Sequence, residues 1–197
     1  MQTKSLPIES HPLPPFLPPQ ARLLMLGSFP PPPSRWSMDF FYPNLQNDMW
    51  RILGLVFFGR KDYFLEDGLK GFSKERICAF LCQTGIALSD TAHQVIRHQQ
   101  NASDKSLEIV QPVDLTALLA PMPHCQSCVT TGEKASEALA AIVGLPRPPA
   151  IGAFMYTTYA NRELCVSRLP SSSRAYPMAL EKKAEAYRAF FKEMKML

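Results

Sequence analysis

The sequence lacks any apolar run approaching the roughly 18–20 residues that a membrane-spanning helix needs. Its first residues also lack the basic start and apolar core of a secretory signal peptide. We therefore expect a cytoplasmic protein without a membrane partner. Hydrophobic residues make up 46% and charged residues 19% of the 197 positions, a balance typical of one globular domain with a well-buried core. We expect it to act as a monomer.

The sequence is also short of the features of a disulfide framework or a metal centre. Its five cysteines are an odd number, and cytosolic proteins seldom hold structural disulfides. Cys78 and Cys82 form one close pair, and Cys125 and Cys128 form another. Both pairs lie in apolar surroundings, where free cysteine is a common small core residue. We favour core positions over zinc or an iron–sulfur cluster, and expect neither metal nor cofactor.

Net charge is small, at +4, but it is unevenly placed. Residues 160–197 hold eight Lys or Arg against four Asp or Glu, whereas the rest of the chain is balanced. A basic end suits a polyanionic partner. The charge alone favours the simpler interpretation, the solvated face of an amphipathic helix.

Proline is abundant, and ten of the 19 prolines fall within the first 33 residues. Because each proline fixes φ and lacks an N–H donor, residues 1–20 predict an extended arm on the body of the protein. An SH3-type ligand is the alternative. Residues 21–197 are expected to form the single folded domain.

Four short apolar runs beyond the arm predict buried parallel strands, at 22–27, 85–88, 127–131 and 164–169. Helical periodicity predicts helices at 45–58, 73–83, 112–119, 133–143 and 178–196. This alternation indicates a three-layer α/β/α sandwich around a central, mostly parallel four-stranded sheet. Such sheets collect ligands at the carboxyl ends of their strands.

The first expected strand leads into a proline-stiffened loop, GSFPPPPS at 27–34, and then into FFYPNLQNDMW at 40–50. Flat aromatic rings beside amide side chains suit an unstacked nucleobase, which is sandwiched and recognised on its polar edge. An ordinary proline-rich turn, with Asn44 as a helix N-cap, is the equal alternative.

Two further loops carry polar residues. Asp90 follows the second strand, where it is a ligand candidate or the cap of a turn. The segment LPSSSRAYP at 169–177 enters the basic C-terminal helix. Backbone amides at a helix start bind anions, so this segment is a phosphate-site candidate or a plain capping loop. Its predicted DNA contacts are Leu169 (as a wedge), Pro170, Ser171, Ser172, Ser173 and Arg174, with Lys182 in the following helix.

Taken in order, these segments resemble the uracil-DNA glycosylase superfamily. The segments at 27–34 and 40–50 resemble its motif 1, and most closely the hypoxanthine-DNA (deoxyinosine) glycosylase branch, where a Gly-Ser-x-Pro-Ser loop precedes an aromatic–His–Pro–x–Asn–x–Phe–Trp segment. GIALSD at 85–90 and VTTGEKA at 129–135 are similar to its strand ends, and LPSSSRAY at 169–176 to its minor-groove loop.

The resemblance implies a uracil-DNA-glycosylase-like fold and base excision from DNA without a cofactor. Asn47, three residues before Trp50, matches the asparagine with a catalytic role in the hypoxanthine branch. Asp90 falls where other branches have an asparagine that recognises the base. Phe41 or Tyr42 would stack on the flipped base, and the two are not distinguished. Gly27, Ser28 and Phe29 complete the expected base site.

The sequence departs from the family at important positions. Phe29 stands where most branches carry the polar residue that activates water, Leu169 replaces the histidine or asparagine that opens motif 2, and the histidine of the His–Pro–x–Asn segment is absent. A catalytically weak or silent DNA- or base-binding protein is therefore the alternative. A doubly wound hydrolase would need a G-x-S-x-G nucleophile elbow, which the sequence lacks.

Overall fold

The computed structural model describes residues 6–68, 70–98 and 106–197. Its central sheet has five strands in the order β3-β2-β6-β8-β7. They are β2 (Leu23–Gly27), β3 (Ile86–Asp90), β6 (Ser127–Thr131), β7 (Phe154–Tyr159) and β8 (Arg162–Leu169). The first three and β8 are mutually parallel, as expected, and β7 is antiparallel to β8.

The strand β7 corrects the expectation of four strands. It forms a hairpin with β8 through Ala160 and Asn161, which both have positive φ, as in the turns that join two-residue hairpins. Its residues, FMYTTY, are half-buried or exposed because β7 lies at the edge of the sheet. An edge strand needs no continuous apolar run, so this strand lacks the signal by which the others were found.

A second sheet was also not predicted. It is antiparallel, in the order β1-β4-β5, with β1 (Ile8–Ser10), β4 (Ala92–Arg97) and β5 (Leu107–Pro112). A small core of Phe29, Ala92, Val95 and Leu107 lies against it. Pro112 therefore ends a strand and does not begin the helix expected at 112–119. That helix, α3, is only Leu115–Leu119, with the Asp114 carboxylate accepting from the Ala117 N–H.

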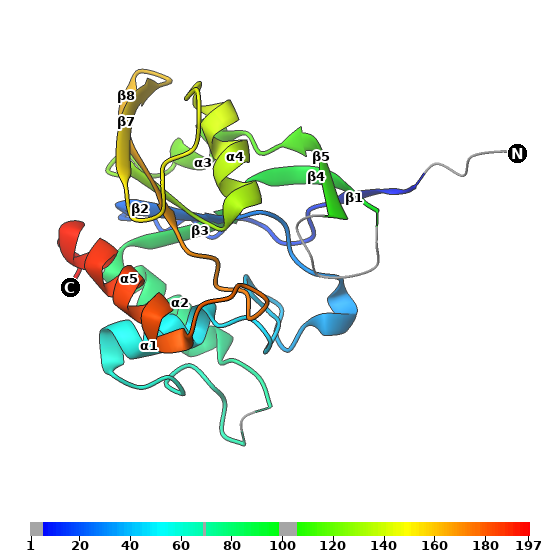
Figure 1. Ribbon diagram of the computed structural model, residues 1–197, viewed down its shortest axis with the longest axis vertical. Coiled ribbons are helices and arrows are strands. Elements are labelled where there is room, and N and C mark those ends of the chain that lie inside the picture. Colours follow the sequence, from blue (N-terminus) through cyan, green and yellow to red (C-terminus); the bar gives the residue numbers. More distant parts are fainter. Residues whose placement is uncertain (1–5, 69, 99–105) are drawn as a thin grey trace, which may run out of the picture.

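Helices cover the two faces of the central sheet (Figure 1), and a hydrophobic core lies between the sheet and the helices on each face. On one face, residues such as Met25 and Leu88 pack against α1 (Met49–Phe58), α2 (Lys74–Thr84) and α5 (Leu180–Glu193). On the other face, residues such as Leu24 and Cys128 pack against α3 and α4 (Glu133–Ile142). The expected three layers are present. Among the described residues, no helix is long and apolar enough to cross a bilayer.

The first helix begins four residues later than expected because local side-chain bonds compete with it. The Asn44 Oδ1 accepts from the Gln46 N–H, and the Asn47 Oδ1 accepts from the Met49 N–H. Such bonds stabilise turns in place of a helix. The segment from Asn44 to Asp48 is consequently a loop at the carboxyl edge of the sheet.

The cysteines follow their expected positions only in part. Cys125 and Cys128 are buried in the second core, and burial raises the pKa of the Cys128 thiol far above its ordinary value. Cys82, by contrast, is exposed on α2. All five cysteines are free thiols.

The N-terminal segment lies along the free edge of β3. Beyond β1, the backbone of Phe16 exchanges two hydrogen bonds of 2.9 Å with that of Leu88. An unpaired sheet edge is open to association, and this segment covers it. It also carries the chain across the carboxyl end of β3, where the polar residues gather.

Candidate functional site

The carboxyl ends of the parallel strands bring together residues from four separate parts of the sequence. Gly27 ends β2 directly opposite Asp90 of β3, and Thr131 of β6 lies opposite Leu169 of β8. In an open α/β sheet this edge is where ligands bind. Five of the expected site positions lie at this edge or in the loops that leave it: Gly27, Ser28, Phe29, Asp90 and Leu169.

Asp90 is buried, with 6% of its surface exposed, and it does not serve as the cap of a turn. Its Oδ2 lies 2.8 Å from the Nε2 of His11 in the N-terminal arm. Its Oδ1 lies over Gly27, so close that a Cβ atom at position 27 would collide with it. Gly27 is required here by this close approach.

His11 is a site residue that the sequence did not indicate. Its ring packs edge-on against Phe29, with centroids 5.3 Å apart, and lies 6.1 Å from the ring of Phe41 at 31°. Burial lowers the pKa of His11, but the hydrogen bond and the charge of Asp90 outweigh burial, so that its pKa is raised above 6.5. The contact with Asp90 therefore favours the imidazolium form of His11.

Aromatic rings enclose this pair. Phe41 is nearly fully buried, and Phe29 packs in the small core of the second sheet. Tyr42 has a left-handed backbone, with φ of 50°, and its hydroxyl lies 3.1 Å from the Oγ1 of Thr131. This unusual conformation places a phenol at the strand ends beside Gly27. Of the two stacking candidates, Phe41 lies near the ring of His11, whereas the Tyr42 hydroxyl lies beside Thr131 and close to the Asp90 Oδ1 at Gly27.

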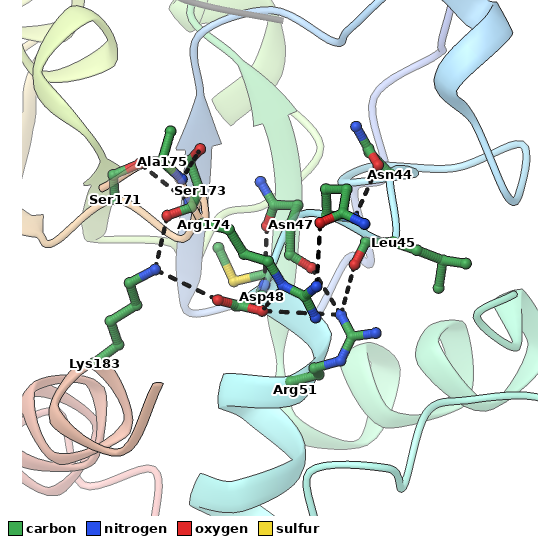
Figure 2. Close-up of polar contacts among 12 residues, drawn as sticks. Asn44, Leu45, Asn47, Asp48, Arg51, Ser171, Ser173, Arg174, Ala175 and Lys183 are labelled. Atoms are coloured by element: carbon green, nitrogen blue, oxygen red, sulfur yellow. Dashed lines mark hydrogen bonds and ion pairs between the residues drawn. The ribbon is translucent and has the colours of Figure 1, made fainter. Parts of the chain in front are cut away.

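Asn47 lies in the next loop, at the start of α1. Its Oδ1 accepts the Met49 N–H at 2.9 Å, so its oxygen has the role of a helix cap. Figure 2 shows its amide nitrogen turned away from that bond. The side chain of Asn47 can therefore donate N–H hydrogen bonds to a ligand, but it cannot act as a general base.

Behind Asn47, the buried carboxylate of Asp48 joins three cations (Figure 2). It lies 2.9 Å from the Nε of Arg174, 3.5 Å from the Nζ of Lys183 and 3.9 Å from the NH1 of Arg51. Lys183 is 1% exposed, and it also donates to the Ser173 carbonyl at 2.7 Å. The Asp48 N–H donates to the Ser172 carbonyl at 2.8 Å. These contacts, which we call the Asp48 cluster, connect the loop of Asn47 to the segment at 169–177, which we call the serine loop.

The serine loop differs from the expectation in two contacts. Leu169 is 1% exposed and belongs to the first core, so its side chain is not available as a wedge. Arg174 is half-exposed, but its Nε is paired with Asp48.

Other residues of this region follow ordinary turn and surface chemistry. The hydroxyls of Ser171 and Ser173 accept backbone N–H groups at 3.2 Å, and the Pro170 carbonyl accepts from the hydroxyl of Tyr187. Ser172 is buried. Lys182 is exposed on α5, with Glu185 as its partner at 2.8 Å.

Comparison with known proteins adds a likeness in fold. No protein-family model matches the chain, and neither does any curated protein. A solved solution NMR structure from Methanosarcina acetivorans, described as a "putative Uracil DNA glycosylase", matches with a TM-score of 0.62 and 22% sequence identity. The match covers 94% of this chain and 99% of that one. The expected α/β fold is therefore shared with that structure, whereas the uracil-DNA glycosylase superfamily and its hypoxanthine branch stay predictions.

The Asp48 cluster generates a stability prediction. Asp48→Asn would leave Lys183 buried without a counter-charge, and we expect it to lower the free energy of unfolding by about 3–5 kcal/mol. Chemical denaturation measures this. Asp62→Asn, which removes the partner of Arg60 at the exposed surface, is the control and should cost below about 1 kcal/mol. Adding Lys183→Met to Asp48→Asn should restore part of the lost free energy of unfolding. Equal losses for Asp48→Asn and Asp62→Asn would contradict a stabilising role of Asp48 as the counter-charge of Lys183.

The close approach of Gly27 and Asp90 generates a second prediction. In Gly27→Ala the new methyl group must displace the Asp90 carboxylate, and we expect a loss of about 1–3 kcal/mol in the free energy of unfolding. The same substitution in an Asp90→Ala background should cost much less, because the colliding oxygen is gone. Denaturation of the four proteins in this double-mutant cycle is the measurement, and additive costs would argue against the contact.

Proposed function

We propose that this protein is a DNA glycosylase that flips a deaminated base, uracil or hypoxanthine, out of DNA and hydrolyses its N-glycosidic bond. One observation carries the proposal: a buried carboxylate, Asp90, directs an oxygen over Gly27 at the carboxyl edge of a parallel sheet, among aromatic rings. The likeness in fold to the Methanosarcina structure supports it.

The chemistry of Asp90 matches the edge of a deaminated base. An ionised carboxylate can only accept hydrogen bonds. Uracil and hypoxanthine both present a ring N–H beside a carbonyl, whereas the corresponding ring nitrogen of cytosine or adenine is an acceptor. A carboxylate therefore favours uracil over cytosine and hypoxanthine over adenine, the normal bases from which they derive, and the rings of Phe41 or Tyr42 supply a face for stacking.

Glycosidic cleavage develops positive charge on the sugar and negative charge on the departing base. A sugar with this much cationic character is attacked by water that needs little activation. Asn47 fits such a reaction, because its bound oxygen fixes the side chain while its N–H groups position a water or a sugar oxygen. The reaction as proposed uses water alone as nucleophile and requires no metal and no lyase step.

The serine loop is proposed as the phosphate contact. Because the hydroxyls of Ser171 and Ser173 already accept backbone N–H groups, their own O–H groups remain to donate to a phosphate. Arg174 in the serine loop and Lys182 in α5 are both exposed and add positive charge to this region. With Leu169 buried, insertion into the base stack is left to another residue.

A second candidate function, a DNA- or base-binding protein without catalysis, is favoured by the position of Phe29. Its side chain packs into the core of the second sheet, so this position of motif 1 supplies no polar group to a water. Catalysis then depends on Asn47.

The test is an excision assay on duplex and single-stranded oligonucleotides that contain uracil or hypoxanthine, followed by alkaline cleavage at abasic sites. We expect product from the wild type and a loss of about 10²–10³ in single-turnover rate for Asn47→Ala. Asn44→Ala, in the same loop, is the matched control, because Asn44 only caps the turn at Gln46.

A second variant separates capping from catalysis. Asn47→Asp keeps an oxygen for the Met49 N–H but loses both amide donors, so it should retain stability and lose activity. Undiminished activity in Asn47→Ala would refute the role of Asn47. Binding of DNA without product on any substrate would establish the second candidate in place of the first.

A further inference from the structure

The arm residue His11 has no role in the proposed reaction so far, although it touches three of the base-site residues. Its Nε2 contacts the Asp90 carboxylate, and its ring contacts Phe29 and lies near Phe41. The side chain is 9% exposed. A histidine held this tightly against a recognition carboxylate changes what that carboxylate can do.

Asp90 alone poses an electrostatic problem for glycosidic cleavage. The departing base gains negative charge at the edge that Asp90 contacts, and a bare buried carboxylate would repel it. Like charges a few ångströms apart in a site of low dielectric oppose each other strongly. A cation beside Asp90 removes this repulsion while leaving the oxygen able to accept the base N–H.

We infer that His11 is a positioning residue for base recognition, whose imidazolium binds one oxygen of Asp90, neutralises the carboxylate and leaves the other oxygen for the ring N–H of the flipped base. This inference rests on the proposed function. It assigns the N-terminal arm to the active site, where sequence patterns had indicated only a surface covering.

The geometry around the pair is preorganised for this role. The Nδ1 of His11 lies 2.9 Å from the Leu13 carbonyl oxygen and 3.2 Å from the Leu13 backbone nitrogen, so in the imidazolium form the Nδ1–H can donate to that carbonyl while the Nε2–H donates to Asp90. The backbone N–H of His11 donates to the backbone carbonyl of His93 at 2.8 Å, and the backbone of Phe16 is hydrogen-bonded to β3. With Oδ2 bound to His11, Oδ1 is the oxygen turned toward Gly27.

Within residues 6–68, 70–98 and 106–197, the other charged groups near His11 are themselves paired or directed elsewhere. Glu9, two residues before it, pairs with Arg97 of β4 at 3.1 Å, and that guanidinium lies over the ring of Phe29. On β4, the His93 side chain is exposed, and Tyr42 of the motif 1 loop contacts Thr131. A cavity of about 290 Å³ beside the pair, lined by Leu13, Ser89 and Val113 among others, gives the imidazole access to solvent protons.

The sign of the pH dependence follows from this arrangement. Burial lowers the pKa of His11, but the hydrogen bond and the charge of Asp90 raise it by more, so the imidazolium is favoured below that raised pKa and is lost as pH rises through it. We expect kcat/KM for base excision by the wild type to fall as pH rises through the pKa of His11.

The variant His11→Gln tests this, because glutamine keeps an N–H donor for Asp90 but carries no charge. We expect kcat/KM to drop by about tenfold or more, which corresponds to the loss of one charge-assisted hydrogen bond. The fall of kcat/KM as His11 loses its proton should also disappear. His93→Gln, on the neighbouring strand with an exposed side chain, is the matched control and should keep the wild-type profile.

Two measurements without turnover keep the inference separate from the proposed function. In NMR titrations the pKa of His11 should be lower in Asp90→Asn than in the wild type. Free uracil or hypoxanthine should bind His11→Gln about tenfold more weakly than the wild type.

The outcomes are distinct. A wild type that releases no base on any substrate, yet shows both NMR and binding effects, would refute the proposed function and keep the His11–Asp90 assignment. An active wild type with His11→Gln equal to it in rate and pH profile would overturn the inference. A His11→Gln variant that is faster than the wild type would also overturn the inference, because it would mean that His11 occupies the place of the base. So would a His11 pKa that does not change in Asp90→Asn.

Discussion

The buried carboxylate of Asp48 is the interaction on which the arrangement of the site depends. Its oxygens accept hydrogen bonds from Arg174 and Lys183, and the Asp48 backbone N–H donates to the Ser172 carbonyl. Asp48 therefore connects the loop of Asn47, the serine loop and α5. Taking a lysine out of water is costly unless the charge is paired and hydrogen-bonded, and Asp48 with the Ser173 carbonyl does both. Asn47 and the serine hydroxyls are thereby fixed relative to each other, although they lie far apart in the sequence.

Two buried carboxylates thus have different tasks at the same edge of the sheet. Asp48 contacts several cations and lies behind the loops, where it positions the backbone. Among the residues that the structure describes, Asp90 pairs with His11 and keeps an oxygen directed over Gly27. A carboxylate whose oxygens are all committed is structural, whereas one with an open oxygen among aromatic rings is suited to a ligand. The same contrast distinguishes the bound oxygen of Asn47 from its amide nitrogen.

Sequence periodicity predicted the parallel strands and most of the helices, because buried strands and amphipathic helices carry local signals. It missed β7 and the second sheet, whose short strands are half-exposed. It also proposed Leu169, the last residue of an expected buried strand, as a wedge, although the side chain is buried in the core. His11, Asp48 and Lys183 could not be found locally. Their partners are 79 residues away for His11–Asp90, 126 for Asp48–Arg174 and 135 for Asp48–Lys183. Lys182 and Lys183 are adjacent residues of the same type in α5. They differ in the direction in which the helix points each side chain, so that Lys182 is exposed and Lys183 is buried.

The central claim is that the Asp90 edge receives a flipped base. The most direct measurement is a crystal structure of the protein with duplex DNA that carries a deoxyuridine or deoxyinosine fluorinated at C2′, where fluorine slows cleavage by disfavouring positive charge on the sugar. The account predicts the base extruded from the duplex, with its ring N–H within hydrogen-bond distance of the Asp90 Oδ1 and its stacking face on Phe41 or Tyr42. A base left in the duplex, or bound away from Asp90, would contradict it.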